Sequence, residues 1–237
     1  MSAADTGYRS GFVGIVGRPN VGKSSLLNYY LGEKISIVSP RPQTTRHRVL
    51  GVLTREDAQV MFLDTPGLCT PQSPLERYML EVAKSVIDEA DVLVVMIDGR
   101  VGITEDDERV FSRLRQALAG GRAGNRAAPP CLLAINKVDV ARKPRLLPVL
   151  ERCAKTGIFA ECIPVSALTG DQMDLLLACI IARLPQGPRW YEAQDRTDQP
   201  MSRMVSERVR EQILFATRAE VPHTAAVLVE EIAELAQ

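Results

Sequence analysis

The feature that most constrains the fold is the segment Gly17–Ser24, which reads GRPNVGKS. It matches the pattern GxxxxGK[ST] and lies between a short apolar run, residues 11–16, and a stretch with helical spacing that begins near Lys23. Glycines at 17 and 22 allow a tight turn whose N–H groups face phosphate oxygens, and the helix N-terminus adds its dipole. The pattern predicts a phosphate-binding loop, with Lys23 at the β- and γ-phosphates of a nucleotide and Ser24 at Mg²⁺.

The rest of the main region alternates between apolar runs of strand length and amphipathic stretches. The hydrophobic pattern predicts a hairpin from residues 49–53 and 59–63, further strands at 92–97, 131–135 and 161–165, and helices at 75–90, 106–118, 145–156 and 171–184. Continuous apolar runs are typical of strands covered by helices on both faces. We therefore expect a three-layer α/β fold with a mostly parallel sheet, with ligands bound at the carboxyl ends of its strands.

Composition shifts suggest how the chain is divided. We expect an N-terminal tail at 1–10, a main domain at 11–185, a linker rich in proline and charge at 186–200, and a small segment at 201–237. Within that last segment, residues 201–218 have helical spacing, and 224–231 fit either a strand or a second helix. Residues 119–130 have low complexity and predict a flexible surface loop. The final segment is too short to fold independently without help from elsewhere.

Charge and cysteine content narrow the class of protein. The formal net charge is +0, so no bulk charge indicates a nucleic-acid or membrane partner. The five cysteines are odd in number and lack CxxC spacing, which favours reduced thiols over disulfides or a zinc site. No apolar run approaches the about 20 residues of a membrane-spanning helix. We expect a cytoplasmic protein without a transmembrane segment, and keep peripheral association with the inner membrane as an alternative.

A second motif, DTPG, begins at Asp64, directly after the apolar residues 61–63. Its carboxylate is expected at the carboxyl end of a strand, at the edge where the phosphate-binding loop also opens. Asp64 is then placed to hold Mg²⁺ through its water shell, and Gly67 to offer a backbone N–H to the γ-phosphate.

A third motif, NKVD at residues 136–139, follows the strand predicted at 131–135. An aspartate at 139 can accept hydrogen bonds from the N1–H and 2-amino groups of guanine, whereas adenine has no donor at either position. Asn136 is expected to hold neighbouring loops and touch the base, and the stem of Lys137 to cover the ring. Backbone N–H groups of Ser166 and Ala167 are expected to supply the remaining base contact.

Together these motifs resemble the bacterial Era family of translation-factor-related P-loop GTPases. The resemblance is carried by GRPNVGKSSLLN at 17–28, PQTTRHR at 42–48, FLDTPGL at 62–68, NKVD at 136–139 and VSALTG at 165–170. It implies hydrolysis of GTP to GDP and phosphate with Mg²⁺, and a role in assembling the small ribosomal subunit with 16S rRNA as partner. It also implies a switch loop in which Thr44 or, preferably, Thr45 closes on Mg²⁺ and the γ-phosphate.

The catalytic prediction has one open question. Leu68 occupies the position where some GTPases place a glutamine that orients the attacking water, so positioning and phosphate electrostatics must supply catalysis. The resemblance implies a K⁺ ion coordinated through Asn20, and a role for Asn20 in capping the loop alone is the alternative. The predicted catalytic residues are Lys23, Thr45, Gly67 and Asn20, and the predicted metal ligands are Ser24, Thr45 and Asp64.

The C-terminal segment resembles the opening helix and strand of an RNA-binding KH domain, and the chain is expected to be truncated within that domain. A KH module grips nucleotide backbone through a GxxG loop. No GxxG follows Pro185, and from Arg189 onward nine acidic residues outnumber six basic ones. Direct rRNA binding by this segment is therefore not expected from its residues.

Two other functions fit parts of the sequence: an RNA-binding assembly factor with a regulatory nucleotide site, and a catalytically silent guanine-nucleotide-binding module. The full set of residues expected at GTP or GDP is Gly17, Arg18, Pro19, Asn20, Val21, Gly22, Lys23, Ser24, Ser25, Thr44, Thr45, Asp64, Thr65, Pro66, Gly67, Leu68, Asn136, Lys137, Val138, Asp139, Ser166, Ala167 and Leu168.

Overall fold

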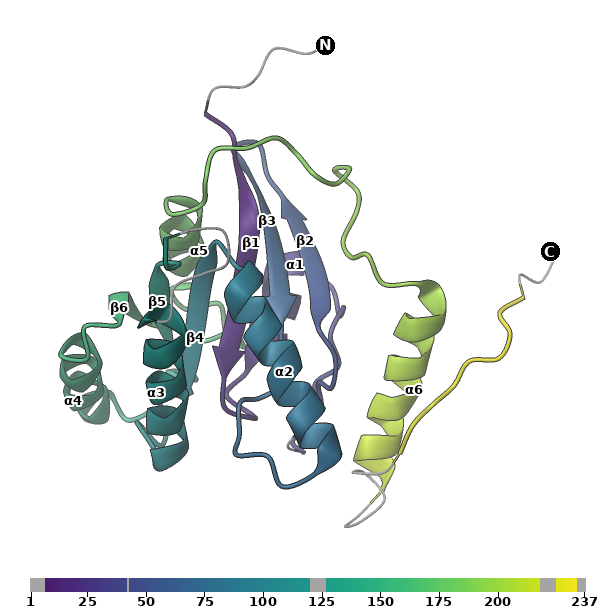
Figure 1. The fold of residues 1–237 in the computed structure, drawn as a ribbon, viewed down its shortest axis with the longest axis horizontal. Helices are drawn as coiled ribbons and strands as arrows, with labels where there is room; N and C mark the ends of the chain where they lie inside the picture. Colours follow the sequence, from purple (N-terminus) through teal and green to yellow (C-terminus); the bar gives the residue numbers. More distant parts are fainter. Residues whose placement is uncertain (1–6, 42, 120–126, 218–224, 234–237) are drawn as a thin grey trace.

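The computed structural model describes residues 7–41, 43–119, 127–217 and 225–233, and this part of the chain contains a six-stranded sheet (Figure 1). The strand order is β2-β3-β1-β4-β5-β6, and only β2 runs antiparallel to its neighbour. The strands are β1 Arg9–Gly17, β2 Val49–Thr54, β3 Ala58–Asp64, β4 Val92–Asp98, β5 Cys131–Asn136 and β6 Phe159–Pro164. The predicted hairpin, β2 with β3, is confirmed.

Helices cover both faces of the sheet. Helices α1 (Lys23–Leu31) and α5 (Met173–Ile181) share one hydrophobic core with the strands, and α2 (Pro74–Glu89), α3 (Glu105–Ala119) and α4 (Lys143–Ala154) share another. All seven residues of β3 and all seven of β4 are buried, as expected for strands packed between two helical layers. The predicted three-layer α/β fold is therefore confirmed.

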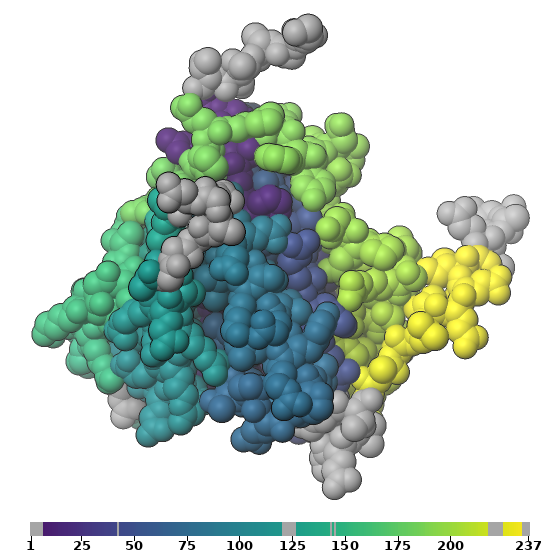
Figure 2. Space-filling model, in the orientation of Figure 1, coloured from purple at the N-terminus to yellow at the C-terminus, as the bar shows by residue number. Residues whose placement is uncertain are grey.

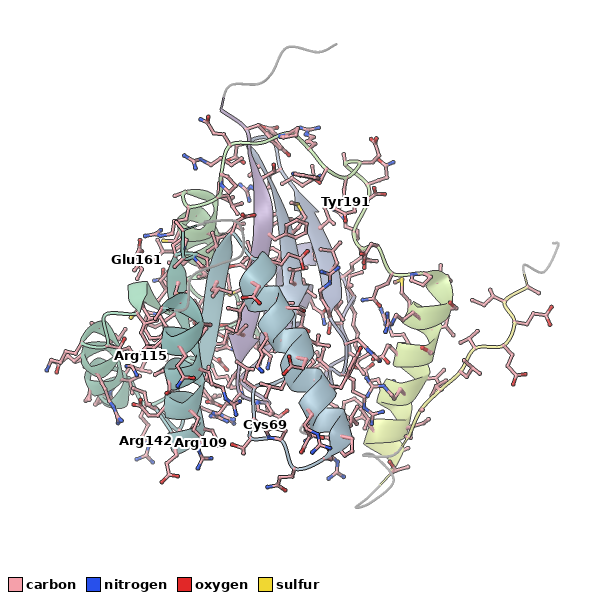
Figure 3. All side chains as sticks on the ribbon, viewed as in Figure 1. Cys69, Arg109, Arg115, Arg142, Glu161 and Tyr191 are labelled. Carbon is pink, nitrogen blue, oxygen red and sulfur yellow. The ribbon has the colours of Figure 1, made fainter. Side chains whose placement is uncertain are left out.

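The segment between α5 and α6 (Met201–Ala216) lies along the sheet. The N–H of Val52 in β2 donates to the carbonyl of Arg196 at 2.8 Å, and the Thr197 hydroxyl donates to the carbonyl of Leu50 at 2.7 Å. Tyr191, labelled in Figure 3, and Trp190 both donate their N–H groups to the side chain of Gln59. These contacts bring α6 beside the β2 edge of the sheet (Figure 1).

Several expectations about the less regular parts of the chain were wrong or fall outside the described residues. β1 begins at Arg9, inside the expected tail. Residues 120–126 of the expected loop lie outside the described residues, as does residue 42. Residues 225–231 form neither a helix nor a strand. A strand needs a neighbour to bond its backbone, and none pairs with this segment in the described part of the chain, where the Leu228 side chain is 84% exposed.

Two general expectations concern thiols and the membrane. All five cysteines lie in the described part of the chain and are free thiols. Among the described helices, none combines the length and apolar character needed to cross a membrane.

Candidate functional site

The predicted loops meet at the carboxyl edge of the sheet through side-chain contacts. The amide nitrogen of Asn136 donates to the carbonyl of Val21 in the phosphate-binding loop at 2.8 Å. The amide oxygen of Asn136 accepts the N–H of Ala167 at 3.0 Å. Lys137 Nζ donates to the carbonyl of Asn20 at 2.6 Å. The NKVD segment therefore joins the first loop to the loop after β6.

Close packing explains both glycines of the phosphate-binding loop. Gly22 has a φ of +104°, and a Cβ added there would lie 2.2 Å from the amide nitrogen of Asn136. A Cβ at Gly17 would lie 2.5 Å from the carbonyl oxygen of Met96. Neither position can hold a side chain unless the neighbouring loops move.

Lys23 begins α1 and is buried under the phosphate-binding loop. Its ammonium donates to the carbonyls of Gly17 at 3.2 Å and Arg18 at 3.0 Å. Burial lowers the pKa of Lys23 to about 8, against the opposing attraction of Asp64. Lys23 also lines a cavity of about 440 Å³, within the usual size of a small-ligand site. An anion in this cavity would give the ammonium a charged partner.

Three oxygen-bearing side chains from separate segments meet beside this cavity. The Ser24 hydroxyl donates to Asp64 Oδ2 at 2.7 Å and lies 3.1 Å from Thr45 Oγ1. Asp64 is fully buried, and its Oδ1 has no hydrogen-bond partner among the described residues. Burial raises the pKa of Asp64. Hydroxyl and carboxylate oxygens are the ligands that Mg²⁺ prefers, so the donor set and the unpaired carboxylate oxygen fit that ion.

The two threonines of the switch loop have different neighbours. The Thr44 hydroxyl bonds within its own loop, to Ser39 Oγ and to the carbonyl of Arg41, both at 2.8 Å. Only the Thr45 hydroxyl reaches Ser24. The geometry therefore favours Thr45 over Thr44 as the residue that meets the metal.

The DTPG loop packs against the phosphate-binding loop. The N–H of Leu68 donates to the carbonyl of Gly17 at 3.0 Å, and a Cβ at Gly67 would lie 2.6 Å from Pro19. The hydroxyl of Thr65 donates to the carbonyl of Ile15, and the Leu68 side chain is buried in the core between the sheet and α2–α4. Thr65 and Leu68 therefore cannot offer these side chains to a nucleotide in this arrangement.

The end of the site where the sequence predicts base recognition is open. Asp139 is exposed, and its Oδ1 accepts a hydrogen bond from the Ser166 hydroxyl at 2.7 Å. The backbone contact expected from Ser166 and Ala167 is not supported, because their N–H groups already donate to the carbonyl of Asp171 and to Asn136 Oδ1. The VSALTG motif gives no indication of these two hydrogen bonds, so they could not be predicted from the sequence.

Sequence reasoning missed two carboxylates that hold the site together. Asp98, the last residue of β4, accepts Lys137 Nζ at 2.7 Å and the guanidinium of Arg100. Burial would raise the pKa of Asp98, but the hydrogen bonds from Arg100 and Lys137 outweigh it and hold the pKa at about 2. Asp107 in α3 pairs with Arg18 at 3.2 Å. Asp98 ends an apolar strand at the same edge as Asp64, so the same rule could have found it.

Two further polar groups connect the switch loop to the site. Ser36 Oγ donates to Asp64 Oδ2 at 2.8 Å, and no sequence signal marked it. The amide nitrogen of Asn20 donates to the carbonyl of Pro40 at 3.0 Å. Asn20 thus holds the switch loop in this structure, which is compatible with its capping role.

A buried lysine under a glycine-rich loop, the oxygen cluster of Ser24, Thr45 and Asp64, and the NKVD loop meet at one sheet edge. This combination defines a P-loop nucleotide-binding protein. A family model described as 50S ribosome-binding GTPase matches residues 12–137. GTPase Era of Leuconostoc citreum (strain KM20) is 39% identical over 231 residues, which are 97% of this chain and 73% of the relative.

Two solved structures similar to this chain belong to the same family as the relative above. The structure of Era in complex with MgGDPNP and nucleotides 1506–1542 of 16S ribosomal RNA matches with a TM-score of 0.84 and 39% identity, over 92% of this chain and 70% of that one. A variant of Aquifex aeolicus Era bound to GDP and AlF4⁻ matches with a TM-score of 0.82 and 39% identity, over 90% and 70% of the two chains. The chain belongs to the Era family of GTPases.

Proposed function

We propose that this chain hydrolyses GTP as a switch in the assembly of the small ribosomal subunit, with 16S rRNA as its partner. One observation supports the nucleotide part of this proposal. The Ser24 hydroxyl lies within hydrogen-bonding distance of both Thr45 and Asp64, which come from two other segments, and Lys23 is buried next to Ser24 in the chain. The ribosomal part is supported by the similarity to Era bound to MgGDPNP and a 16S rRNA fragment.

Each residue of the proposed nucleotide site has a distinct role in hydrolysis. Mg²⁺, when bound, neutralises charge on the β- and γ-phosphates, and Ser24, Thr45 and Asp64 would hold it. Lys23 supplies a positive charge to the same phosphates, and the Gly67 N–H is proposed to meet the γ-phosphate. Since Leu68 cannot orient water, catalysis depends on positioning and on electrostatic stabilisation of the transferred group.

We expect GTP turnover to be faster in K⁺ than in Na⁺ at equal ionic strength. The proposed reason is that the amide oxygen of Asn20 would hold K⁺, and this ion would add positive charge that stabilises the transition state. Phosphate release with GTP and Mg²⁺ measures this, with Asn20→Ala as the variant expected to lose the difference. Equal rates in both salts would leave Asn20 with its capping role alone, and no phosphate release at all would indicate a silent nucleotide-binding module.

Filter binding tests the proposed rRNA partner, which is supported by the similarity to Era bound to a 16S rRNA fragment. Direct recognition requires that the chain retain RNA carrying the 3′ end of 16S rRNA above a shuffled RNA of equal length. We propose the division into a G domain at 11–185, a linker at 186–200 and a KH-like segment at 201–237. The absence of GxxG after Pro185 predicts weak retention. Retention equal to that of the shuffled RNA would rule out direct rRNA recognition and leave only the proposed GTPase activity.

We propose a cytoplasmic location for the protein. Cell fractionation would distinguish this location from peripheral membrane association.

A further inference from the structure

Helix α6 lies against the switch segment, defined here as residues 33–41 and 43–45. In Figure 1 the C-terminal end of α6 lies at the end of the molecule where β1 and β3 finish, and Figure 2 shows α6 packed on early residues of the chain. Phe215, near the end of α6, lines the same cavity as Lys23 and Ser24. A helix outside the nucleotide-binding motifs therefore reaches the wall of the nucleotide cavity.

Two buried charged side chains of α6 make this contact. Glu211 is 1% exposed; it accepts the N–H of Val38 at 2.9 Å and pairs with Lys34 Nζ at 2.6 Å. Arg210 is 3% exposed and donates to the carbonyl of Thr44 at 2.6 Å. Buried charges are costly unless they are paired and hydrogen-bonded. The switch segment supplies both partners of Glu211 and one of the partners of Arg210, whose guanidinium also pairs with Glu207 on α6. A displaced segment would leave Glu211 without a partner and Arg210 with Glu207 alone.

The hydrogen bond from Arg210 is made to the residue directly before Thr45, the proposed metal ligand. The carbonyl of Thr44 belongs to the peptide that continues into Thr45, and the Thr45 hydroxyl lies 3.1 Å from Ser24 Oγ. Fixing this peptide restricts where the Thr45 hydroxyl can lie. At the other end, Glu211 fixes the backbone at Val38, so α6 holds the segment at two points.

We propose that Arg210 and Glu211 are positioning residues of the nucleotide site, which hold the switch segment so that Thr45 stays beside Ser24 and Asp64. This inference rests on the proposed role of Thr45 at Mg²⁺ and the γ-phosphate. It adds α6 to the parts of the chain that determine how long GTP remains bound.

The test is the rate at which fluorescent nucleotides dissociate from the full chain in Mg²⁺. In Glu211→Leu we expect release of a non-hydrolysable GTP analogue to be about tenfold faster, within the usual range of site-to-site coupling, while GDP release changes less than twofold. Only GTP has the γ-phosphate on which Thr45 closes. Val209→Ala, at an exposed position on the same helix, is the matched control and should behave as the wild type.

Further variants separate positioning from folding. Glu211→Gln keeps an oxygen for the Val38 N–H and should restore most of the GTP retention. In a Thr45→Ala background, Glu211→Leu should add nothing, because the residue it positions is gone. Equal acceleration of GTP and GDP release, or rates equal to those of Val209→Ala, would overturn the inference. A wild type whose GTP retention does not depend on Mg²⁺ would instead overturn the metal site itself.

Discussion

Asp139→Asn is expected to lose the preference for GTP and to gain affinity for xanthosine triphosphate. The Asp139 carboxylate is proposed to accept hydrogen bonds from two donors on guanine, and the Ser166 hydroxyl, which donates to its Oδ1 at 2.7 Å, holds it in place. A carboxamide presents an N–H₂ group where guanine also donates, whereas xanthine has a carbonyl oxygen at position 2 that can accept. Sites that hydrogen-bond a particular group reject analogues lacking it by about 10⁴-fold, so the GTP affinity should fall by several orders of magnitude.

Competition binding of GTP, xanthosine triphosphate and ATP to both proteins measures this change. Asp174→Asn, at an exposed position in α5, is the control with the same chemical substitution. The fold should survive in Asp139→Asn because Asp139 is exposed and an amide oxygen can still accept from Ser166. An unchanged GTP preference would mean that Asp139 does not read the base.

The sequence predicted the site best where a motif follows a strand. Lys23, Asp64 and Asp139 each belong to a motif that follows a buried apolar strand. Parallel strands have their carboxyl ends at the same edge of the sheet. Three motifs far apart in the chain could therefore be placed together without coordinates. Asp98 obeys the same rule and was overlooked because it belongs to no motif.

Contacts between segments distant in sequence could not be predicted. Arg210 and Glu211 read as ordinary charged residues on an amphipathic helix, yet both are buried against a loop more than 160 residues earlier in the chain. The segment at 186–200 has no hydrophobic period, and nothing in its composition shows that Arg196 and Thr197 bond the edge strand β2. Backbone bonding at a sheet edge depends on shape and proximity, which a one-dimensional pattern does not record.

Lys23→Met is expected to weaken GTP binding by about 10²- to 10⁴-fold, because two charge-assisted hydrogen bonds to phosphate, each contributing about 1.5–3 kcal/mol, are lost. Methionine keeps the length and apolar stem of the side chain without its charge. Equilibrium binding of a fluorescent GTP analogue measures the loss, and Lys84→Met, at an exposed position in α2, is the matched control. Equal affinities in the two variants would remove Lys23 from the phosphate site.

The pH dependence of binding tests the same residue without a mutation. Burial lowers the pKa of Lys23 to about 8 in the free protein, and only the protonated form carries the charge that attracts phosphate. Binding should therefore be strongest below this pKa and weaken as the pH rises through it, by about fourfold between pH 7 and 8.5. In Lys23→Met this slope should disappear, since the titrating group is gone. A wild-type affinity that stays constant over this range would show that Lys23 is protonated throughout it. The pKa of Lys23 in the free protein would then lie above this range.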